Sequence, residues 1–272
     1  MSTVQLNRTK GLARWTAMLQ KELLEQVRSF KLVWVPLVFM VLGIMQPLST
    51  YYMPLILEKT GNLPTGTVID IPMPSAVEVL ASTLQQYGTI GVLVIALVGM
   101  GAVSAERNSG IASLILVKPI PAWFFISSKW AANTILAWVA LLLGYGAAYY
   151  YTIVLFGEVK LVLFLNSYLV YGTWLTLIVT LTILFSTLLR SGAGAAFSAI
   201  GVILVLSLSA SLLPKYMKWS PGALSGYAYQ TVMDSIAAPM MVFWSLASTV
   251  AVIAAALFAA SYYLKSSTAV DH

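Results

Sequence analysis

The sequence predicts an all-α membrane protein with six transmembrane helices, and two observations lead to that fold class. Hydrophobic residues make up 60% of the 272 residues and charged residues only 9%, against about 25% charged residues in an ordinary soluble domain. The chain also contains six apolar runs near or above the roughly 20 residues that cross a bilayer core of about 30 Å. Because amides in hydrocarbon must pair internally, these runs are expected to be helices.

The first element, residues 1–31, precedes the apolar runs and is expected to be an amphipathic helix at the cytoplasmic interface. Its apolar side chains recur at steps of three and four residues, the spacing of one helix face. That face holds Leu12, Trp15, Leu19, Leu23, Val27 and Phe30. The charged residues lie largely on other faces and are Arg14, Lys21, Glu22, Glu25 and Arg28. Such a helix either anchors the chain to membrane lipid or also contacts a cytosolic partner, and both alternatives stay open.

The six spans form one transmembrane domain, residues 32–265, which is followed by a cytoplasmic tail, residues 266–272. The spans are expected at 32–53, 87–105, 131–156, 161–189, 192–213 and 240–264. Two longer loops, 54–86 and 214–239, are expected on the outer side. Ser75 followed by Glu78 is a capping-box pattern, which predicts a short helix over residues 77–86 in the first of these loops.

Basic residues set the expected orientation. With the N-terminus inside, eleven of the 15 lysines and arginines fall on inner segments and four on outer loops. The net charge of +6 is therefore explained by membrane orientation, not by binding of nucleic acid. We expect a multi-pass protein of the cell (plasma) membrane with both termini in the cytoplasm. The chain has no cysteine, and its single histidine is the last residue, His272, so thiolate or histidine metal sites and histidine catalysis are not expected.

The loop at residues 106–130, between the second and third spans, is the most polar inner segment of the domain. Glu106 and Arg107 end the second span, and Gly110 has the conformational freedom for a tight turn. A short helix is expected to follow. One face of that helix carries Ile111, Leu114 and Ile115, and Pro119 ends it. On physical grounds alone, a plain interfacial connector explains this loop at least as well as a docking site.

The loop resembles that of ABC-2 type ABC transporter permeases, in which Glu-basic-x-x-Gly precedes an apolar helix, a proline and a later lysine. The matching positions are Glu106, Arg107, Gly110, Leu114, Ile115, Pro119, Ile120 and Lys129. The start of the chain is also similar to that family, through Lys21-Glu22-Leu23 and Arg28. One departure is clear: the family's Thr-Leu-Glu after the glycine is Ile111-Ala112-Ser113 here, so a salt bridge from that glutamate is not available.

The resemblance implies a membrane-spanning permease subunit, most simply of an exporter. Two such subunits would pair as a homodimer or heterodimer, and two separate cytosolic ABC ATPase subunits would dock below them. The ATPases would bind ATP and Mg²⁺, and this chain would bind no cofactor and would not itself be an enzyme. In agreement, the sequence lacks the G-x-x-x-x-G-K-[ST] phosphate loop. The helix over residues 110–117 would be the coupling helix, with the N-terminal helix beside it.

Two other classes of protein remain as alternatives. A non-transporting membrane sensor or immunity protein fits the spans equally well. A membrane-embedded enzyme fits less well, because paired intramembrane carboxylates, histidine and cysteine are missing. The six spans contain no clear charged residue, which argues against an ion-coupled carrier. A substrate path would then be apolar or lined by hydroxyls, for which the candidates are Thr176, Thr180, Thr182, Ser186, Ser207 and Ser209.

Overall fold

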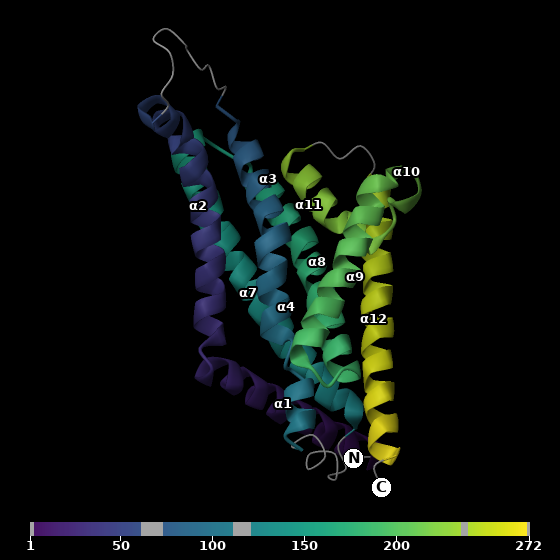
Figure 1. Cartoon of the computed structure of the whole chain (residues 1–272). Coiled ribbons are helices and arrows are strands. Elements are labelled where there is room, and N and C mark those ends of the chain that lie inside the picture. Colours follow the sequence, from purple (N-terminus) through teal and green to yellow (C-terminus); the bar gives the residue numbers. More distant parts are fainter. Residues whose placement is uncertain (1–2, 61–72, 111–120, 235–238, 271–272) are drawn as a thin grey trace.

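The computed structural model describes residues 3–60, 73–110, 121–234 and 239–270, and within these ranges it contains helices and no strand. Six helical stretches are long and apolar enough to cross a membrane, and they stand side by side in one bundle (Figure 1). The predicted fold class is therefore confirmed. The predicted coupling helix between the second and third spans falls largely outside the described residues.

Five spans are single helices. They are α2 (Lys31–Thr60), α7 (Ala122–Phe156), α8 (Leu161–Leu188), α9 (Gly192–Leu212) and α12 (Pro239–Val270). The third span thus begins at Ala122, not at residue 131, because the polar residues near its start lie in the helix and are buried. Helix α8 is the centre of the bundle. In its most apolar 18-residue stretch, 78% of the residues are buried, against 22–44% in the corresponding stretches of the other spans.

The second span is a composite of several segments. They are α3 (Ala76–Gln86), a π-helical turn (Tyr87–Gly91), α4 (Val92–Gly99) and α5 (Ser104–Asn108). The predicted capping box is confirmed, since the Ser75 amide donates to Glu78 Oε2 at 2.7 Å and the Glu78 amide donates to Ser75 Oγ. However, α3 is not a separate helix of an outer loop. It continues into the span because Val79, Leu80 and Leu84 are buried against the bundle.

Helices α2 and α7 cross at a pair of glycines. A Cβ atom on Gly43 would lie 2.2 Å from the Gly144 carbonyl oxygen, so no larger residue fits at this crossing. The Tyr87 hydroxyl donates to the Phe39 carbonyl at 2.7 Å beside the same crossing. Small residues let membrane helices approach closely, and here the contact lies within the chain.

The hydroxyls proposed for a substrate path mostly hold α8 in place. Thr176, Thr180 and Thr182 donate back to carbonyls of α8, as hydroxyls in apolar surroundings commonly do. Two of them also accept a hydrogen bond from α7, where Trp130 Nε1 reaches Thr180 Oγ1 and Trp138 Nε1 reaches Thr176 Oγ1, both at 2.9 Å. Thr176 and Thr180 therefore join the two spans α7 and α8.

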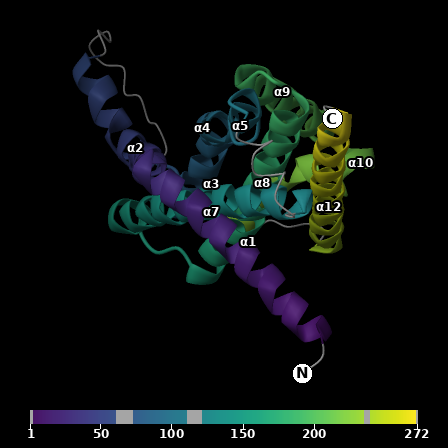
Figure 2. The ribbon, with the colours of Figure 1, turned by 90° about the horizontal axis from the view of Figure 1, so that it is seen from below.

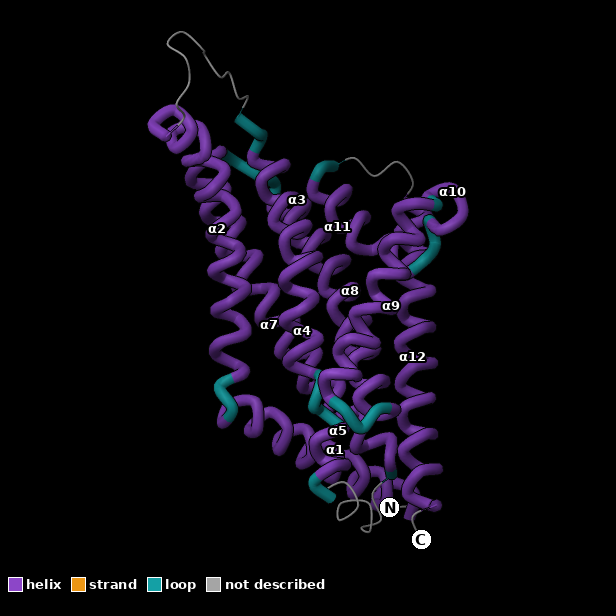
Figure 3. The backbone as a smooth tube through the Cα atoms, in the orientation of Figure 1, coloured by secondary structure: helices purple, strands orange, loops and turns teal. Residues whose placement is uncertain are grey.

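The two ends of the bundle carry different elements. Helix α1 (Thr3–Arg28) lies across one end of the bundle instead of running along the spans (Figures 1 and 2). The tube drawing shows the sharp corner between α1 and α2, where Phe30 has a φ of 57° (Figure 3). The opposite end carries α10 (Pro214–Met217), a 3₁₀ turn (Pro221–Ala223) and α11 (Leu224–Val232). The predicted outer loop at residues 214–239 is therefore wrong in part, because α11 is a helix with one buried face.

Candidate functional site

Helix α1 packs on the bundle with a face that the apolar pattern did not predict. Trp15, Glu22 and Gln26 are turned toward the bundle, and Trp15 Nε1 donates to Ser127 Oγ of α7 at 2.9 Å. The predicted apolar face is divided, because Leu12 and Val27 are 66% and 52% exposed whereas Trp15 is half-buried. Exposed leucine and valine on a helix across the end of a membrane bundle are suited to lie against lipid.

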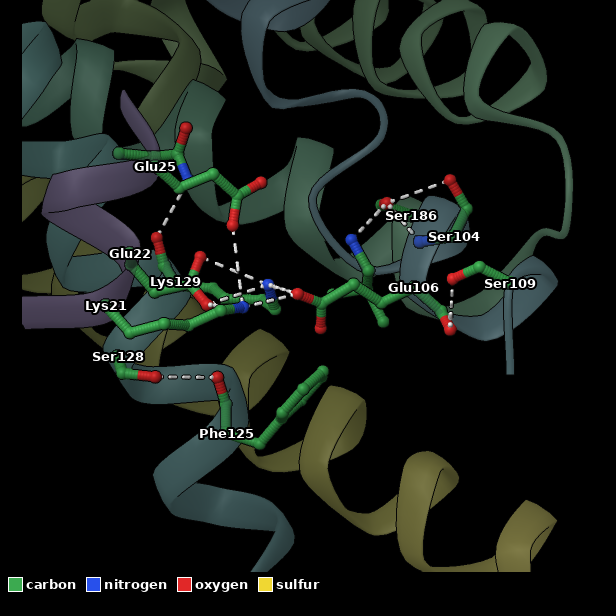
Figure 4. A network of polar contacts seen from close by, with 12 residues as sticks. Lys21, Glu22, Glu25, Ser104, Glu106, Ser109, Phe125, Ser128, Lys129 and Ser186 are labelled. Carbon is green, nitrogen blue, oxygen red and sulfur yellow. Dashed lines mark hydrogen bonds and ion pairs between the residues drawn. The ribbon is translucent and has the colours of Figure 1, made fainter. Parts of the chain in front are cut away.

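At this packed face lies a group of charges that we call the lysine–glutamate cluster: Lys21, Glu22, Glu25, Glu106 and Lys129 (Figure 4). Lys129 Nζ lies 3.0 Å from Glu22 Oε1 and 3.1 Å from Glu106 Oε1. Lys21 Nζ lies 2.6 Å from the same Glu106 oxygen and 3.0 Å from Glu22 Oε1. Three helices contribute to the cluster, since Glu106 belongs to α5 and Lys129 to α7.

The central ion pairs of the cluster are shielded from water. Lys129 has a side chain only 2% exposed, and the side chains of Glu22 and Glu106 are 11% and 13% exposed. A buried charge is costly unless an opposite charge and hydrogen bonds compensate for it. Glu22 is predicted to lie away from the apolar face of the N-terminal helix, and Lys129 ahead of the third span. Instead, both are buried, and each meets the other 107 residues away in the sequence.

Lys21 closes the cluster on its water-exposed side. Partial burial lowers the pKa of Lys21, but hydrogen bonds to Glu106 and Glu22 outweigh this effect, and the pKa lies above its usual value. Carboxylate oxygens of Glu22, Glu25 and Glu106 come within 4.8 Å of one another, a spacing that could also suit a metal ion. Two lysine ammonium groups already lie among these carboxylates, so the arrangement is an ion-pair network.

The residues after Glu106 are fixed to other spans. Arg107 donates to the Thr187 carbonyl at the end of α8, and its guanidinium lies 5.7 Å from the ring centre of Tyr263 in α12. Asn108 Nδ2 donates to the Arg190 carbonyl at 2.8 Å. The start of the loop is thus held by the last turn of α8, by Arg190 just after that helix and by α12, in addition to the cluster.

A break in the second span precedes this loop. Between α4 and α5 the helix is interrupted, and Ser186 of α8 satisfies the freed groups. Its Oγ accepts from the amides of Val103 and Ser104, both at 3.1 Å, and donates to the Met100 carbonyl at 2.8 Å. Among the hydroxyls predicted to line a path, Ser186 has this different role, which no local sequence pattern signalled.

Gly110 is the last described residue before the predicted coupling helix. Its φ of +74° lies in the left-handed region, which favours glycine, and a Cβ atom there would meet nothing within 4 Å. The predicted tight turn is therefore present. The other predicted coupling residues, Ile111, Leu114, Ile115 and Pro119, lie outside the described residues.

The predicted site residues accordingly fall into separate groups. Lys21, Glu22, Glu25 and Glu106 come together in the lysine–glutamate cluster. Arg107 points to α8 and α12, and Arg28 is exposed at the end of α1. Lys129 was noted only as the later lysine of the loop motif, yet it is the most buried member of the cluster. That motif position was the one signal that could have identified it.

Comparison with known proteins gives one informative relative. No family model matches the chain. The chain is 41% identical over 208 residues to an uncharacterized transmembrane protein, YxlG, of Bacillus subtilis (strain 168), and the match covers 76% of this chain and 81% of that protein. The alignment thus spans most of both proteins; the relative is named a transmembrane protein, and this chain has six helices long and apolar enough to cross a membrane. This chain therefore belongs to the same family as the transmembrane protein YxlG.

Proposed function

We propose that this chain is the membrane-spanning subunit of an ATP-driven exporter of the ABC-2 type. In this proposal a separate cytosolic ABC ATPase docks on the loop at residues 106–130 and on neighbouring α1. Two ATPase subunits bind ATP and Mg²⁺, and a second permease subunit completes the membrane part. The complex lies in the cell membrane with both termini in the cytoplasm, and exposed apolar residues of α1 contact lipid.

The observation that carries this proposal is the lysine–glutamate cluster. Glu106, which leads into the loop, shares its Oε1 with Lys21 of α1 and Lys129 of α7. Any displacement of the loop therefore acts directly on α1 and on a membrane span. Coupled movement of packed elements is how a docking event at one end of a protein reaches a distant part. A plain connector between two spans has no need for a buried lysine that is paired with glutamates of two other helices.

The first experiment tests for the ATPase. The tagged chain is purified from membranes of its own host in mild detergent, and bound proteins are identified by mass spectrometry. We expect an ABC ATPase in about equal amount, as the ABC-2 resemblance requires, and ATP turnover by the complex after reconstitution in proteoliposomes. Recovery of the intact chain without any ATPase would contradict the proposal and favour a non-transporting sensor or immunity protein.

A variant then tests the loop. Gly110→Val forces a β-branched residue into a left-handed backbone conformation, at a cost of about 1–2 kcal/mol. Since the space around Gly110 is open, membrane insertion should remain intact. We expect ATP turnover by the complex to fall about tenfold, the effect of about 1.4 kcal/mol. Gly146→Val is the matched control, because its Cβ also meets nothing within 4 Å and Gly146 lies inside α7, far from the loop. Equal turnover in the two variants would remove the loop from the proposal.

The side of the membrane can be tested independently. The chain has no cysteine, so single cysteines report one position each. Ser109→Cys lies at the exposed start of the loop, and Tyr216→Cys lies at the opposite end of the bundle, where Tyr216 is 68% exposed. A membrane-impermeant maleimide added to intact cells should label Tyr216→Cys and leave Ser109→Cys unlabelled. The reverse pattern would exclude docking of a cytosolic ATPase on this loop.

A further inference from the structure

We propose that the chain binds an anionic phospholipid in a cavity at the end of the bundle opposite α1. The cavity has a volume of about 610 Å³ and lies between α9, the 3₁₀ turn and α11. This volume falls in the range of about 300–1,000 Å³ that is typical of small-molecule sites. The site takes the phosphate-bearing headgroup and the upper part of an acyl chain, while the rest of the lipid stays in the bilayer. The proposal does not depend on ATP-driven transport.

The lining of the cavity is amphipathic, as a lipid headgroup and chain require. Its apolar wall comes mainly from α9, α10 and the 3₁₀ turn, through Leu204, Leu208, Ala210, Pro214 and Ala223. Its polar groups are Ser207, Ser211, Ser225, Tyr227 and Gln230. Leu204 and Leu208 are 55% and 56% exposed on the outer face of α9. The cavity therefore borders the surface that faces the bilayer, and a lipid can enter it sideways.

A single positive charge, Lys218, lies in the lining and gives the site its charge preference. The Tyr227 hydroxyl donates to the Lys218 carbonyl at 2.9 Å and thereby fixes the backbone at this position. Within the described part of the chain, no carboxylate lies within ion-pair distance of the Lys218 ammonium group. An exposed ammonium beside hydroxyl donors and an apolar wall matches a phosphate group with an acyl chain attached.

The aromatic residues beside Lys218 indicate the level in the membrane at which the cavity lies. Tyr216 and Trp219 flank it in the sequence and are 68% and 55% exposed. Tyrosine and tryptophan are enriched where a membrane meets water, because their rings are apolar and carry a polar tip. The same level of the bilayer holds phospholipid headgroups, so a phosphate is present at the height of Lys218.

Binding of defined lipids to the purified chain, without any ATPase, tests this proposal. Native mass spectrometry of the chain in detergent measures the affinity for dioleoylphosphatidylglycerol, for dioleoylphosphatidylcholine and for soluble glycerol phosphate. We expect phosphatidylglycerol to bind with the highest affinity and glycerol phosphate to show no binding, because the apolar wall requires a chain. Equal affinity for the two lipids would identify nonspecific lipid contact and overturn the proposal, as would binding of glycerol phosphate alone.

Two variants locate the site. Lys218→Gln removes the charge, and Gly226→Trp fills the cavity from α11, where a Cβ on Gly226 meets nothing within 4 Å. Each should weaken phosphatidylglycerol binding about tenfold, which corresponds to about 1.4 kcal/mol: Lys218→Gln by loss of a charge-assisted contact and Gly226→Trp by loss of space. Lys215→Gln is the matched control, because Lys215 lies three residues earlier, in α10, and outside the lining; it should change binding less than twofold. Equal losses of phosphatidylglycerol affinity in Lys215→Gln and Lys218→Gln would mean that the lipid is attracted by surface charge in general. That result would overturn the proposed site.

Discussion

The two ends of the bundle are held together by different physical means. At the α1 end, five charged side chains from three helices form the lysine–glutamate cluster. At the α10 and α11 end, the backbone itself makes the contact: a Cβ atom on Gly222 would lie 2.1 Å from the Leu206 carbonyl oxygen. The segment that leads into the 3₁₀ turn is tied to α12 by neutral hydrogen bonds, such as the one that Ser245 Oγ donates to the Ser220 carbonyl at 2.8 Å.

This difference indicates which end is suited to move as a unit. Long charged side chains join α1, α5 and α7 through their tips, so the helices can shift together while the ion pairs persist. Backbone-to-backbone packing at Gly222 allows no such adjustment, because interiors tolerate little change in volume. The contrast predicts that the α1 end is sensitive to loss of charge and the opposite end is sensitive to added volume.

The largest effect is expected from Lys129→Met. This change keeps the approximate length of the side chain but leaves the buried Glu22 and Glu106 with Lys21 alone. Removing one partner of a buried ion pair typically costs about 3–5 kcal/mol. We expect a clearly lower midpoint of thermal unfolding in detergent, followed by tryptophan fluorescence. Adding Glu22→Gln to the same variant should recover part of the loss, since it removes one uncompensated charge. If Lys129→Met alone were as stable as the original protein, the ion pairs would not be what stabilises the α1 end of the bundle.

The second prediction concerns the opposite end, where Gly222→Ala should destabilise the protein by about 1–3 kcal/mol, the usual cost of overpacking. The added Cβ meets the α9 backbone at Leu206, which has no rotamer to relieve the contact. Gly226→Ala, a few residues along, is the control, because its Cβ has open space and alanine favours a helix. Thermal unfolding of the two variants measures the difference. If both melt alike, close backbone packing is not what fixes this end.

The third prediction tests a neutral contact at the α1 end. Ser186→Ala removes the hydroxyl that serves the amides of Val103 and Ser104, and an unsatisfied buried donor costs about 1–3 kcal/mol. We expect faster hydrogen exchange at these two amides and a modest loss of thermal stability. Thr187→Val is the matched control, because that hydroxyl only donates back to the Ile183 carbonyl of its own helix. Unchanged exchange in Ser186→Ala would mean that other groups satisfy the helix break.

Hydropathy predicted the six spans but not where two of them begin. The N-terminal parts of the second and third spans contain polar residues, which lower the local hydropathy and are typical of loops. They include Gln85 and Gln86 in α3, and Ser128 and Lys129 in α7. In the folded chain both Ser128 and Lys129 are buried. Ser128 Oγ donates to the Phe125 carbonyl of its own helix, and Lys129 pairs with Glu22 of α1. A window along one sequence cannot detect partners that come from distant positions.

The candidate site could be predicted only in part for the same reason. The loop motif and the N-terminal pattern identified Lys21, Glu22 and Glu106 as separate features. Their pairing depends on the folding of α1 across the end of the bundle, which brings Lys21 to Glu106 across 85 residues. The apolar periodicity of α1 even favoured another face, because the packed face of this helix carries Glu22 and Gln26.

The smallest effect is expected from Lys21→Met, which tests whether burial or distance decides how much an ion pair stabilises the protein. Lys21 makes the shortest ion pair of the cluster, 2.6 Å to Glu106, but its side chain is 47% exposed. Water screens an exposed pair, so the loss of stability should stay below about 1 kcal/mol. The pKa of Lys21 is raised in the folded protein, so its contribution is complete below the pKa of an unfolded lysine and is lost only as the pH rises through the higher folded value. The difference between Lys21→Met and the original protein should therefore be the same at pH 7 and pH 9 in thermal unfolding. A loss as large as that of Lys129→Met would mean that distance, and not burial, sets the strength of the cluster.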